Sequence, residues 1–314
     1  MRNILAFLHG KKEIAILAII SVFMTEIITT STTLLELTSP MTLIFLILGY
    51  ALPVILIREL IILHRLGIVG IFLLGFLAGV YSEGIIAHTL FVDTISPVDI
   101  FASYGVISNI RIPWLLTIGS WQSLHAVVYP IFFMAYLFPH SHTKLYLSDR
   151  WRKILSISLF IISLIFLLIQ GKNLMSESIL YLVLIGILVL CTRRYGHIGK
   201  IDPKKEDMKS SRFWKFGVWL YMAFSLIPLL FAKFEVSLWI YILYFFIICL
   251  MIKKKLSESI LDRVGWISIV AGWVLCVSLF TSLITLPFWL WEQGIIAIIA
   301  TICSMILILY RSTK

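Results

Sequence analysis

Long apolar runs, separated by short polar or basic stretches, make up nearly the whole chain. Ten of these runs approach the roughly 20 residues that a helix needs to cross a bilayer core. They lack the alternation of apolar and polar residues typical of membrane β-barrel strands, so we expect helices. The pattern predicts an all-α, polytopic transmembrane helical bundle with spans at about residues 13–35, 41–64, 67–92, 112–138, 153–170, 177–192, 214–232, 235–252, 264–285 and 287–310.

Composition supports an integral membrane protein. Of the 314 residues, 61% are hydrophobic and only 13% are charged, whereas soluble domains have about 25% charged residues. This balance excludes soluble enzymes, secreted disulfide-bonded proteins and disordered chains. The four cysteines form no CxxC pair, and we interpret them as small packing residues; they are Cys191, Cys249, Cys276 and Cys303.

The basic residues indicate an orientation. If the N-terminus is cytoplasmic, 22 of the 26 Lys and Arg residues fall on the cytoplasmic side of the ten spans, three fall outside and one lies within a span. This distribution follows the positive-inside rule, and it predicts a multi-pass protein of the cell membrane with both termini in the cytoplasm. The net charge of +10 is then explained by the anionic lipid surface, so the bilayer is the expected partner and nucleic acid is not.

Changes in polarity divide the chain into four predicted regions. Residues 1–140 are expected to form a four-helix region with a polar core, and residues 141–195 two scaffold helices. Residues 196–212 read as a basic cytoplasmic linker, followed by a C-terminal four-helix bundle at 213–314. The sequence pattern reveals no internal or inverted repeat of the kind found in common transporters.

Ionisable side chains within the predicted membrane region are concentrated in the first four spans. A charge at mid-bilayer costs at least about 2.5–3.5 kcal/mol, so several of them in one half of a chain are expected to face each other or water. The later spans have almost none in their interiors. The residues in question are Glu26, Arg58, Glu59, Glu83, His88 and His125.

Several of these side chains are predicted to lie at similar depths. With a rise of about 1.5 Å per residue, Glu26 and Glu83 lie about 13 Å from the outer ends of their spans. Trp121 and Gln122 lie about 14–15 Å deep, and His125 about 20 Å deep. We therefore expect these groups, from three spans, to form a polar site in the outer half of the membrane.

The third span carries a stripe of small residues. Gly75, Gly79 and Glu83 follow each other at four-residue steps and share one helix face. Such a stripe allows a neighbouring helix to approach closely, so it predicts a packing seam or, alternatively, room for a substrate beside the carboxylate. His88 lies about 140° around the helix from Glu83, so the two face one point only if the helix end unwinds.

The fourth span places Trp121, Gln122 and His125 on one face. Pro130 removes a backbone donor and frees the carbonyl of Ala126, just below His125. A histidine in this position suits a proton acceptor or a metal ligand. The alternative is a structural histidine hydrogen-bonded to a glutamate of the first or second span.

Arg58 and Glu59 are neighbours in the second span, so their side chains are expected to point about 100° apart. Each then needs another partner, and Glu26 or Glu83 is the expected partner of Arg58 in an interhelical ion pair. Residues of the following outer loop are candidates to roof the site; they are Asp93, Asp99 and Arg111.

Two segments resemble the motifs of a known group of enzymes. SEGIIAH at Ser82–His88 and WQSLH at Trp121–His125 are similar to the EExxxR and FxxxH motifs of the intramembrane CAAX-protease and bacteriocin-processing superfamily. The resemblance covers residues 50–140, and the superfamily's third motif, HxxxN, has no counterpart. It implies that Glu83 is the base that activates water and that His125 is its partner. The chain also resembles uncharacterised polytopic membrane proteins of archaea and bacteria.

Three functions fit these observations. The first is a membrane-embedded hydrolase of peptides or lipids, in which Glu83 acts as general base and His125 as second base or oxyanion stabiliser. A divalent metal cofactor is weakly indicated, because no HExxH spacing is present. The second is a non-catalytic scaffold or a subunit bound to another membrane protein. The third is a proton- or cation-coupled transporter. Supporting or substrate-contacting roles are predicted for Glu26, Arg58, Glu59, His88, Trp121 and Gln122.

Overall fold

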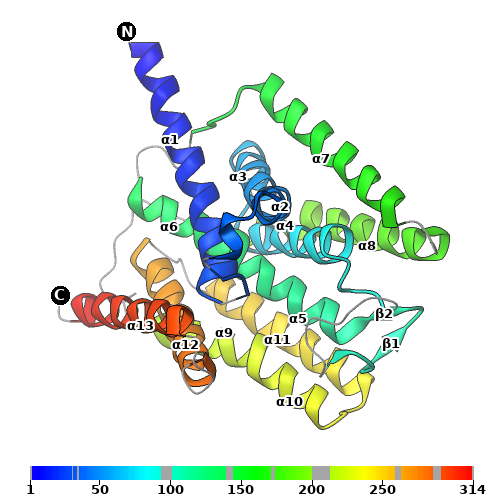
Figure 1. Cartoon of the computed structure of the whole chain (residues 1–314). Helices are drawn as coiled ribbons and strands as arrows, with labels where there is room; N and C mark the ends of the chain where they lie inside the picture. The colour runs from blue at the N-terminus through cyan, green and yellow to red at the C-terminus, as the bar shows by residue number, and fades with distance from the viewer. Residues whose placement is uncertain are drawn as a thin grey trace.

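The computed structural model describes residues 2–29, 31–33, 35–92, 101–138, 144–170, 174–199, 213–258, 263–285 and 291–312. Within these ranges the chain forms ten long helical stretches, several of which contain a π-helical turn (Figure 1). The first four are α1 (Arg2–Val22) with η1 (Phe23–Ile27), α2 (Pro40–Leu46) with η3 (Ile47–Ala51) and α3 (Leu52–His64), α4 (Ile68–Tyr81) with η4 (Ser82–Ile86), and α5 (Ile112–Gln122) with η6 (Ser123–Val128) and α6 (Tyr129–Leu137).

The remaining six stretches follow in the same way. They are α7 (Asp149–Gln170), α8 (Leu174–Tyr195), α9 (Trp214–Tyr221) with η8 (Met222–Leu226) and α10 (Ile227–Lys233), α11 (Leu238–Glu258), α12 (Arg263–Thr285) and α13 (Trp291–Ser312). The predicted helical class is thus confirmed. Of the described helices, four are long and apolar enough to cross a membrane by composition: Pro40–His64, Ile68–Ile86, Trp214–Lys233 and Val264–Thr281. The ten crossings and their orientation stay predictions.

Three of the π-helical turns have a proline as their local cause. Each of η3, η6 and η8 ends two residues before a proline, which are Pro53, Pro130 and Pro228 respectively. Proline cannot donate to the preceding turn and its ring crowds the carbonyl four residues earlier, so the helix widens there. The carbonyl of Ala126, which the sequence predicts to be freed by Pro130, accepts a hydrogen bond of 2.7 Å from Ser21 Oγ of α1.

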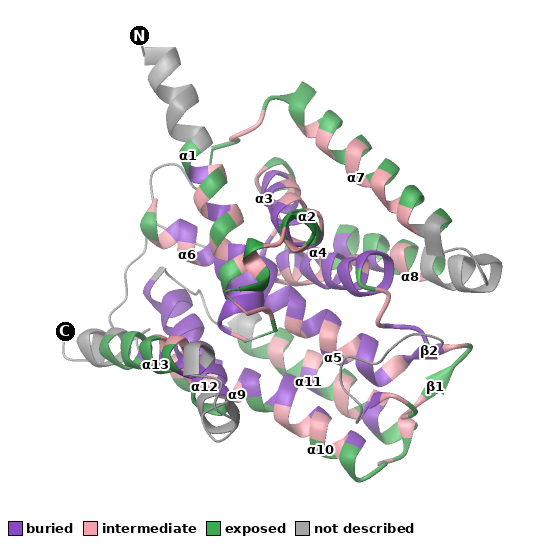
Figure 2. Ribbon diagram, in the orientation of Figure 1, coloured by how far each residue is buried: buried purple, intermediate pink, exposed green. Residues whose placement is uncertain are grey.

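The centre of the molecule is formed by α4 and the stretch α5–η6, whose residues are mostly buried (Figure 2). On the periphery, α7 leaves large apolar side chains exposed, including Phe160 at 65% and Leu168 at 74%. Exposed apolar side chains of this size would be unfavourable in water but are at no disadvantage against lipid. The pattern of burial therefore fits a membrane-embedded bundle with α7 on its lipid-facing side.

The glycine stripe of α4 forms the predicted packing seam. A Cβ on Gly75 would stand 2.6 Å from Ser123 Oγ, and one on Gly79 would stand 2.8 Å from the Cβ of Gln122. No real Cβ tolerates such distances, so only glycine allows α4 and α5–η6 to approach this closely. The close approach brings Glu83 of η4 next to Gln122 of α5.

At the other end of α4, the chain packs onto the end of α8. The backbone amide of Gly67 donates to the carbonyl of Gly196 at 2.6 Å, and that of Ile68 donates to the carbonyl of Gly199 at 3.0 Å. These bonds satisfy first-turn amides of α4 that have no partner within the helix. Both ends are assigned to the cytoplasm by the charge pattern. Residues 200–212 of the predicted linker lie outside the described part.

The connection between α4 and α5 contains a short hairpin whose arginine anchors the segment after α4. Strands β1 (Val106–Ile107) and β2 (Ile110–Arg111) pair antiparallel. Arg111 donates to the carbonyl of Thr89 at 2.9 Å, to that of Ala102 at 3.0 Å and to that of Phe91. Arg111 therefore roofs this end of the bundle through backbone carbonyls, while the predicted roof residues Asp93 and Asp99 lie outside the described residues.

The seam can be tested by adding one methyl group. Gly79→Ala should destabilise the protein by about 1–3 kcal/mol, because the new Cβ overlaps Gln122 and forces the helices apart. Gly186→Ala, where nothing lies within 4 Å, is the matched control and should be neutral or mildly stabilising through helix propensity. Thermal unfolding of the purified protein in detergent measures both; equal melting temperatures would contradict the seam.

Candidate functional site

Each of the first four helical stretches contains one π-helical turn, namely η1, η3, η4 and η6 in chain order. Several of these turns contact one another or a neighbouring helix. Contacts join η1 to η6, η3 to η4, and α4 to η6. A π-helical turn rotates the following side chains and leaves carbonyls poorly paired, and such turns are frequent at functional sites. The region that these four turns occupy, linked in pairs, is therefore a candidate functional site.

Glu83 of η4 is buried at this meeting point and is held by two donors. Its Oε1 accepts a hydrogen bond of 2.9 Å from Gln122 Nε2, and its Oε2 accepts one of 2.5 Å from Thr89 Oγ1. Gln122 Nε2 also donates to the hydroxyl of Tyr50 at 3.2 Å. Trp114 Nε1 in turn donates to Thr89 Oγ1 at 3.2 Å, which fixes that hydroxyl.

Glu26 of η1 is the second buried carboxyl of the site. Its Oε2 accepts a hydrogen bond of 2.7 Å from Thr32 Oγ1. Glu26 and Glu83 interact electrostatically. We call Glu26, Tyr50, Glu83 and Gln122 the acid cluster. Among the described residues, neither carboxyl of this cluster has a lysine or arginine as ion-pair partner.

The two glutamates have the same local structure. Six residues after each glutamate, a threonine donates its hydroxyl to the carboxylate, Thr32 to Glu26 and Thr89 to Glu83. The backbone amide of the same threonine donates to the carbonyl of its glutamate, at 3.3 Å and 2.7 Å respectively. The segments TEIITTST and SEGIIAHT are thus a short structural repeat, which the sequence pattern alone did not reveal.

These fold-back turns correct the predicted ends of two spans. The first span was expected to continue to residue 35 and the third to residue 92, whereas the helices end at Ile27 and Ile86. The physical reason is that the threonine side chains and amides compete for the last helical carbonyls and end the helix. Glu26 and Glu83 therefore lie in the last turns of their helices, much nearer to the helix ends than the estimated 13 Å.

One polar atom of the acid cluster has no partner. Gln122 is 4% exposed, and its Oε1 accepts no hydrogen bond within the described part of the chain. A buried acceptor left unpaired costs about 1–3 kcal/mol. The cluster therefore presents two carboxyls, an amide oxygen and a phenol oxygen, and oxygen donors of this kind suit a proton or a hard cation.

His125 lies in a separate aromatic site. Its Nε2 accepts a hydrogen bond of 2.7 Å from Trp273 Nε1 of α12, and its Nδ1 lies 3.1 Å from the carbonyl of Trp121. Because an indole N–H only donates, Nε2 carries no proton and Nδ1–H is the donor to Trp121. The ring is fully buried and packs on Trp121 at 4.2 Å and on Trp273 at 5.2 Å between centroids.

The predicted set of site residues is thus divided. Glu26, Glu83 and Gln122 come together, whereas His125 and Trp121 belong to the aromatic site, and none of the described contacts joins His125 to Glu83. The helix end does unwind at His88, which has a φ of 58° and packs against Phe91 with ring centroids 4.7 Å apart.

Arg58 and Glu59 pair with each other, contrary to the prediction that they point apart. Arg58 Nη1 donates to Glu59 Oε1, and Arg58 Nη2 donates to the carbonyl of Lys144 at 2.5 Å. Glu59 also accepts from the amides of Tyr146 and Leu147 at 3.1 and 3.0 Å. The long arginine side chain bends back along the helix to reach its neighbour. The pair fixes the connection to α7 instead of bonding to Glu26 or Glu83.

The sequence reasoning missed three residues: Tyr50 of the acid cluster, Thr89, which donates to Glu83, and Trp273 of the aromatic site. Tyr50 is nine residues from Met41, the expected outer start of its span, so the depth argument used for Glu26 would have found it. Thr89 was placed inside a helix, and Trp273 lies 148 residues from its partner. Among the described residues, no group of three His, Cys, Asp or Glu side chains lies together as a metal site would require.

Comparison with known proteins places the chain in a family. The sequence pattern of an uncharacterized membrane protein family matches residues 15–313. The chain belongs to this family. No curated protein and no solved structure matches it. Membership confirms the expected likeness to uncharacterised membrane proteins and supports a location in the membrane, and the match does not show the resemblance to CAAX proteases. The function of this family member has to be argued from its own geometry.

The aromatic site makes a prediction about His125. Trp273→Phe keeps the aromatic packing but removes the donor to His125, so it should lower the free energy of unfolding by about 1–3 kcal/mol. If His125 has only a structural role, Trp273→Phe should not change how the melting temperature depends on protons or sodium ions that bind at the acid cluster. Unfolding in detergent and the ion-dependence of the melting temperature measure the two effects, and a loss of ion-dependence would place His125 in the site.

Proposed function

We propose that this membrane protein binds one proton or one small monovalent cation in the acid cluster and acts as an ion-coupled transporter. The observation that carries the proposal is the burial of Glu26 and Glu83, at 7% exposure each, within electrostatic range of each other and without a basic partner among the described residues. Two neighbouring carboxylates in a site of low dielectric repel each other, and one bound positive charge relieves the repulsion.

The remaining atoms of the cluster favour a shared ion. Tyr50 accepts a hydrogen bond from Gln122, which also donates to Glu83, so a phenol oxygen and an amide lie beside this carboxyl. The unpaired Gln122 Oε1 is a further ligand. Glu26 and Glu83 have the same threonine partner in the same turn, so both carboxyls are presented to the ion in the same way.

The position of the cluster also favours transport over a fixed structural role. The carboxyls lie in the last turns of two helices, at π-helical turns. Arg111 holds the carbonyl of Thr89, the threonine that bonds to Glu83. A π-helical turn has weaker hydrogen bonds than an α-helical turn, so its residues can change register at low cost. Movement there would open the ion site without disrupting the glycine seam below.

The other two hypotheses have less support. A hydrolase in which His125 assists Glu83 requires the two side chains to face one reacting group, and Trp273 and the Trp121 carbonyl occupy both ring nitrogens of His125 instead. A scaffold would need the acid cluster only for stability. The scaffold hypothesis predicts that no ion affects the cluster, and the following experiment separates it from the proposal.

The melting temperature of the purified protein should depend on the bound ion. A ligand of the native state alone stabilises by about 2.7 kcal/mol at a concentration 100 times its dissociation constant. If the ion is a proton, stability is lost as the pH rises through the value at which the native pair releases it. If it is sodium, the melting temperature rises with sodium at constant pH and ionic strength. Glu26→Gln and Glu83→Gln each remove one carboxylate and should abolish the dependence.

Glu36→Gln is the matched control for these variants. Glu36 is exposed and accepts hydrogen bonds from the amide of Thr33 at 2.7 Å and from its hydroxyl at 2.9 Å, which hold the pKa of Glu36 below its usual value. It is therefore an ionised outer-loop acid that takes no part in the cluster, and its variant should keep the ion-dependence. A wild-type protein without any dependence on pH or sodium, or a dependence that survives Glu83→Gln, would contradict the proposal.

Transport itself should fail in the same variants. In proteoliposomes with an enclosed pH- or sodium-sensitive dye, wild-type protein and Glu36→Gln should dissipate an imposed gradient, while Glu26→Gln and Glu83→Gln should not. If the gradient decays equally fast in protein-free and in wild-type vesicles, the protein does not transport the ion. Ion-dependent stability would then show ion binding alone.

A further inference from the structure

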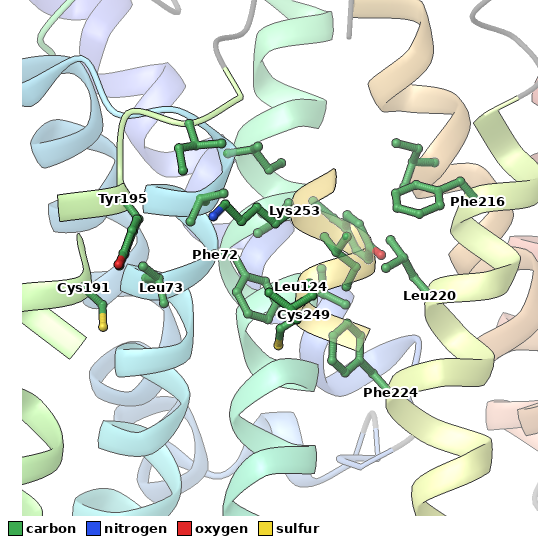
Figure 3. A pocket seen from close by; sticks show the side chains of 18 of the residues that line it. Phe72, Leu73, Leu124, Cys191, Tyr195, Phe216, Leu220, Phe224, Cys249 and Lys253 are labelled. Carbon is green, nitrogen blue, oxygen red and sulfur yellow. The ribbon is translucent and has the colours of Figure 1, made fainter. Parts of the chain in front are cut away.

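A second site, lined by other residues than the acid cluster, is an apolar cavity of about 470 Å³. Figure 3 shows it between α4, η6, α8, α9, α11 and α12, with Cys191 and Tyr195 on one side and Phe216 and Leu220 on the other. Protein interiors are close-packed, and a space of this size is typical of a ligand pocket. None of the four residues of the acid cluster lines it.

The cavity reaches the outer surface of the helix bundle. Two of its lining residues on α11 are largely exposed, Phe246 at 59% and Leu250 at 47%. Neighbouring apolar side chains of α8 are also exposed, such as Leu190 at 65%. In a membrane this surface faces hydrocarbon, so an occupant would enter sideways from the bilayer.

One end of the cavity is basic. Lys253 lines it, and its Nζ lies 5.5 Å from the centroid of the Tyr195 ring, toward which it points in Figure 3. The guanidinium of Arg194 also lies 5.5 Å from that ring. Lys254 and Lys255 follow directly in α11. This is the end of the bundle that the charge pattern assigns to the cytoplasm.

We propose that the cavity binds one hydrocarbon chain of an anionic phospholipid, with the phosphate at Lys253 and Arg194. The apolar walls fit a hydrocarbon chain, the opening faces the lipid, and the cationic end complements an anionic headgroup, for which Lys and Arg near the membrane surface are the usual partners. A zwitterionic lipid would fit the same apolar walls, but the basic end would contribute less to its binding free energy because the headgroup has no net charge.

Native mass spectrometry of the purified full-length protein tests the assignment. The protein is relipidated with an equal mixture of phosphatidylglycerol and phosphatidylcholine, and the retained lipid is identified. Wild-type protein should retain one phosphatidylglycerol. Lys253→Gln should reduce the preference for phosphatidylglycerol about fivefold, the ratio expected for one lysine near an anionic lipid. Lys254→Gln, the neighbouring lysine that does not line the cavity, should keep the wild-type preference.

A variant that fills the cavity distinguishes lipid bound in the cavity from lipid bound elsewhere on the protein surface. Leu220→Trp places an indole in the space and should abolish retention of both lipids, whereas Lys253→Gln, at the cavity mouth, remains informative if the tryptophan variant does not fold. The proposal is overturned if no lipid is retained, if phosphatidylcholine is retained equally well, or if Lys253→Gln and Lys254→Gln behave alike.

Discussion

The structure depends on how two carboxyl groups are accommodated in a low-dielectric interior without a basic side chain among the described residues to pair with them. Glu26 and Glu83 are each held by a threonine six residues further along the chain, and Gln122 links Glu83 to Tyr50. Hydrogen bonds stabilise each carboxylate, but they do not cancel the repulsion between two negative charges. An ion shared by the pair meets this constraint, which is why the site supports ion binding better than an architectural role.

The packing of the surrounding helices positions the side chains of the acid cluster. Glycines at 75 and 79 let α4 approach α5–η6 so closely that Gln122 can reach Glu83. His125, one turn further along, is tied to Trp273 of α12, and Thr117 of α5 is tied to Tyr241 of α11 at 2.5 Å. The helices after residue 213 are thus bonded directly to the helix that carries Gln122. They also provide much of the wall of the apolar cavity, so both candidate sites share one central helix.

Much of the fold and part of the site could be predicted from the sequence, because both rest on local chemistry. Apolar run length gives the helices, four-residue spacing gives the glycine seam, and Pro130 identifies the freed Ala126 carbonyl. The pairing of Arg58 with Glu59 could not be predicted, since side-chain flexibility overrides the helical angle. The bond between His125 and Trp273 links residues 148 positions apart. The glutamate–threonine repeat is visible in the sequence only once the helix ends are known, because an unbroken apolar run conceals the fold-back turns.

The most direct test of the shared charge is the coupling energy between Glu26 and Glu83, measured by chemical unfolding of the two single glutamine variants and the double variant at neutral pH. If the carboxyls share one ion, the double variant should differ from the sum of the single variants by at least about 1 kcal/mol. Effects that add to within about 0.3–0.5 kcal/mol, as they do for independent sites, would contradict the account.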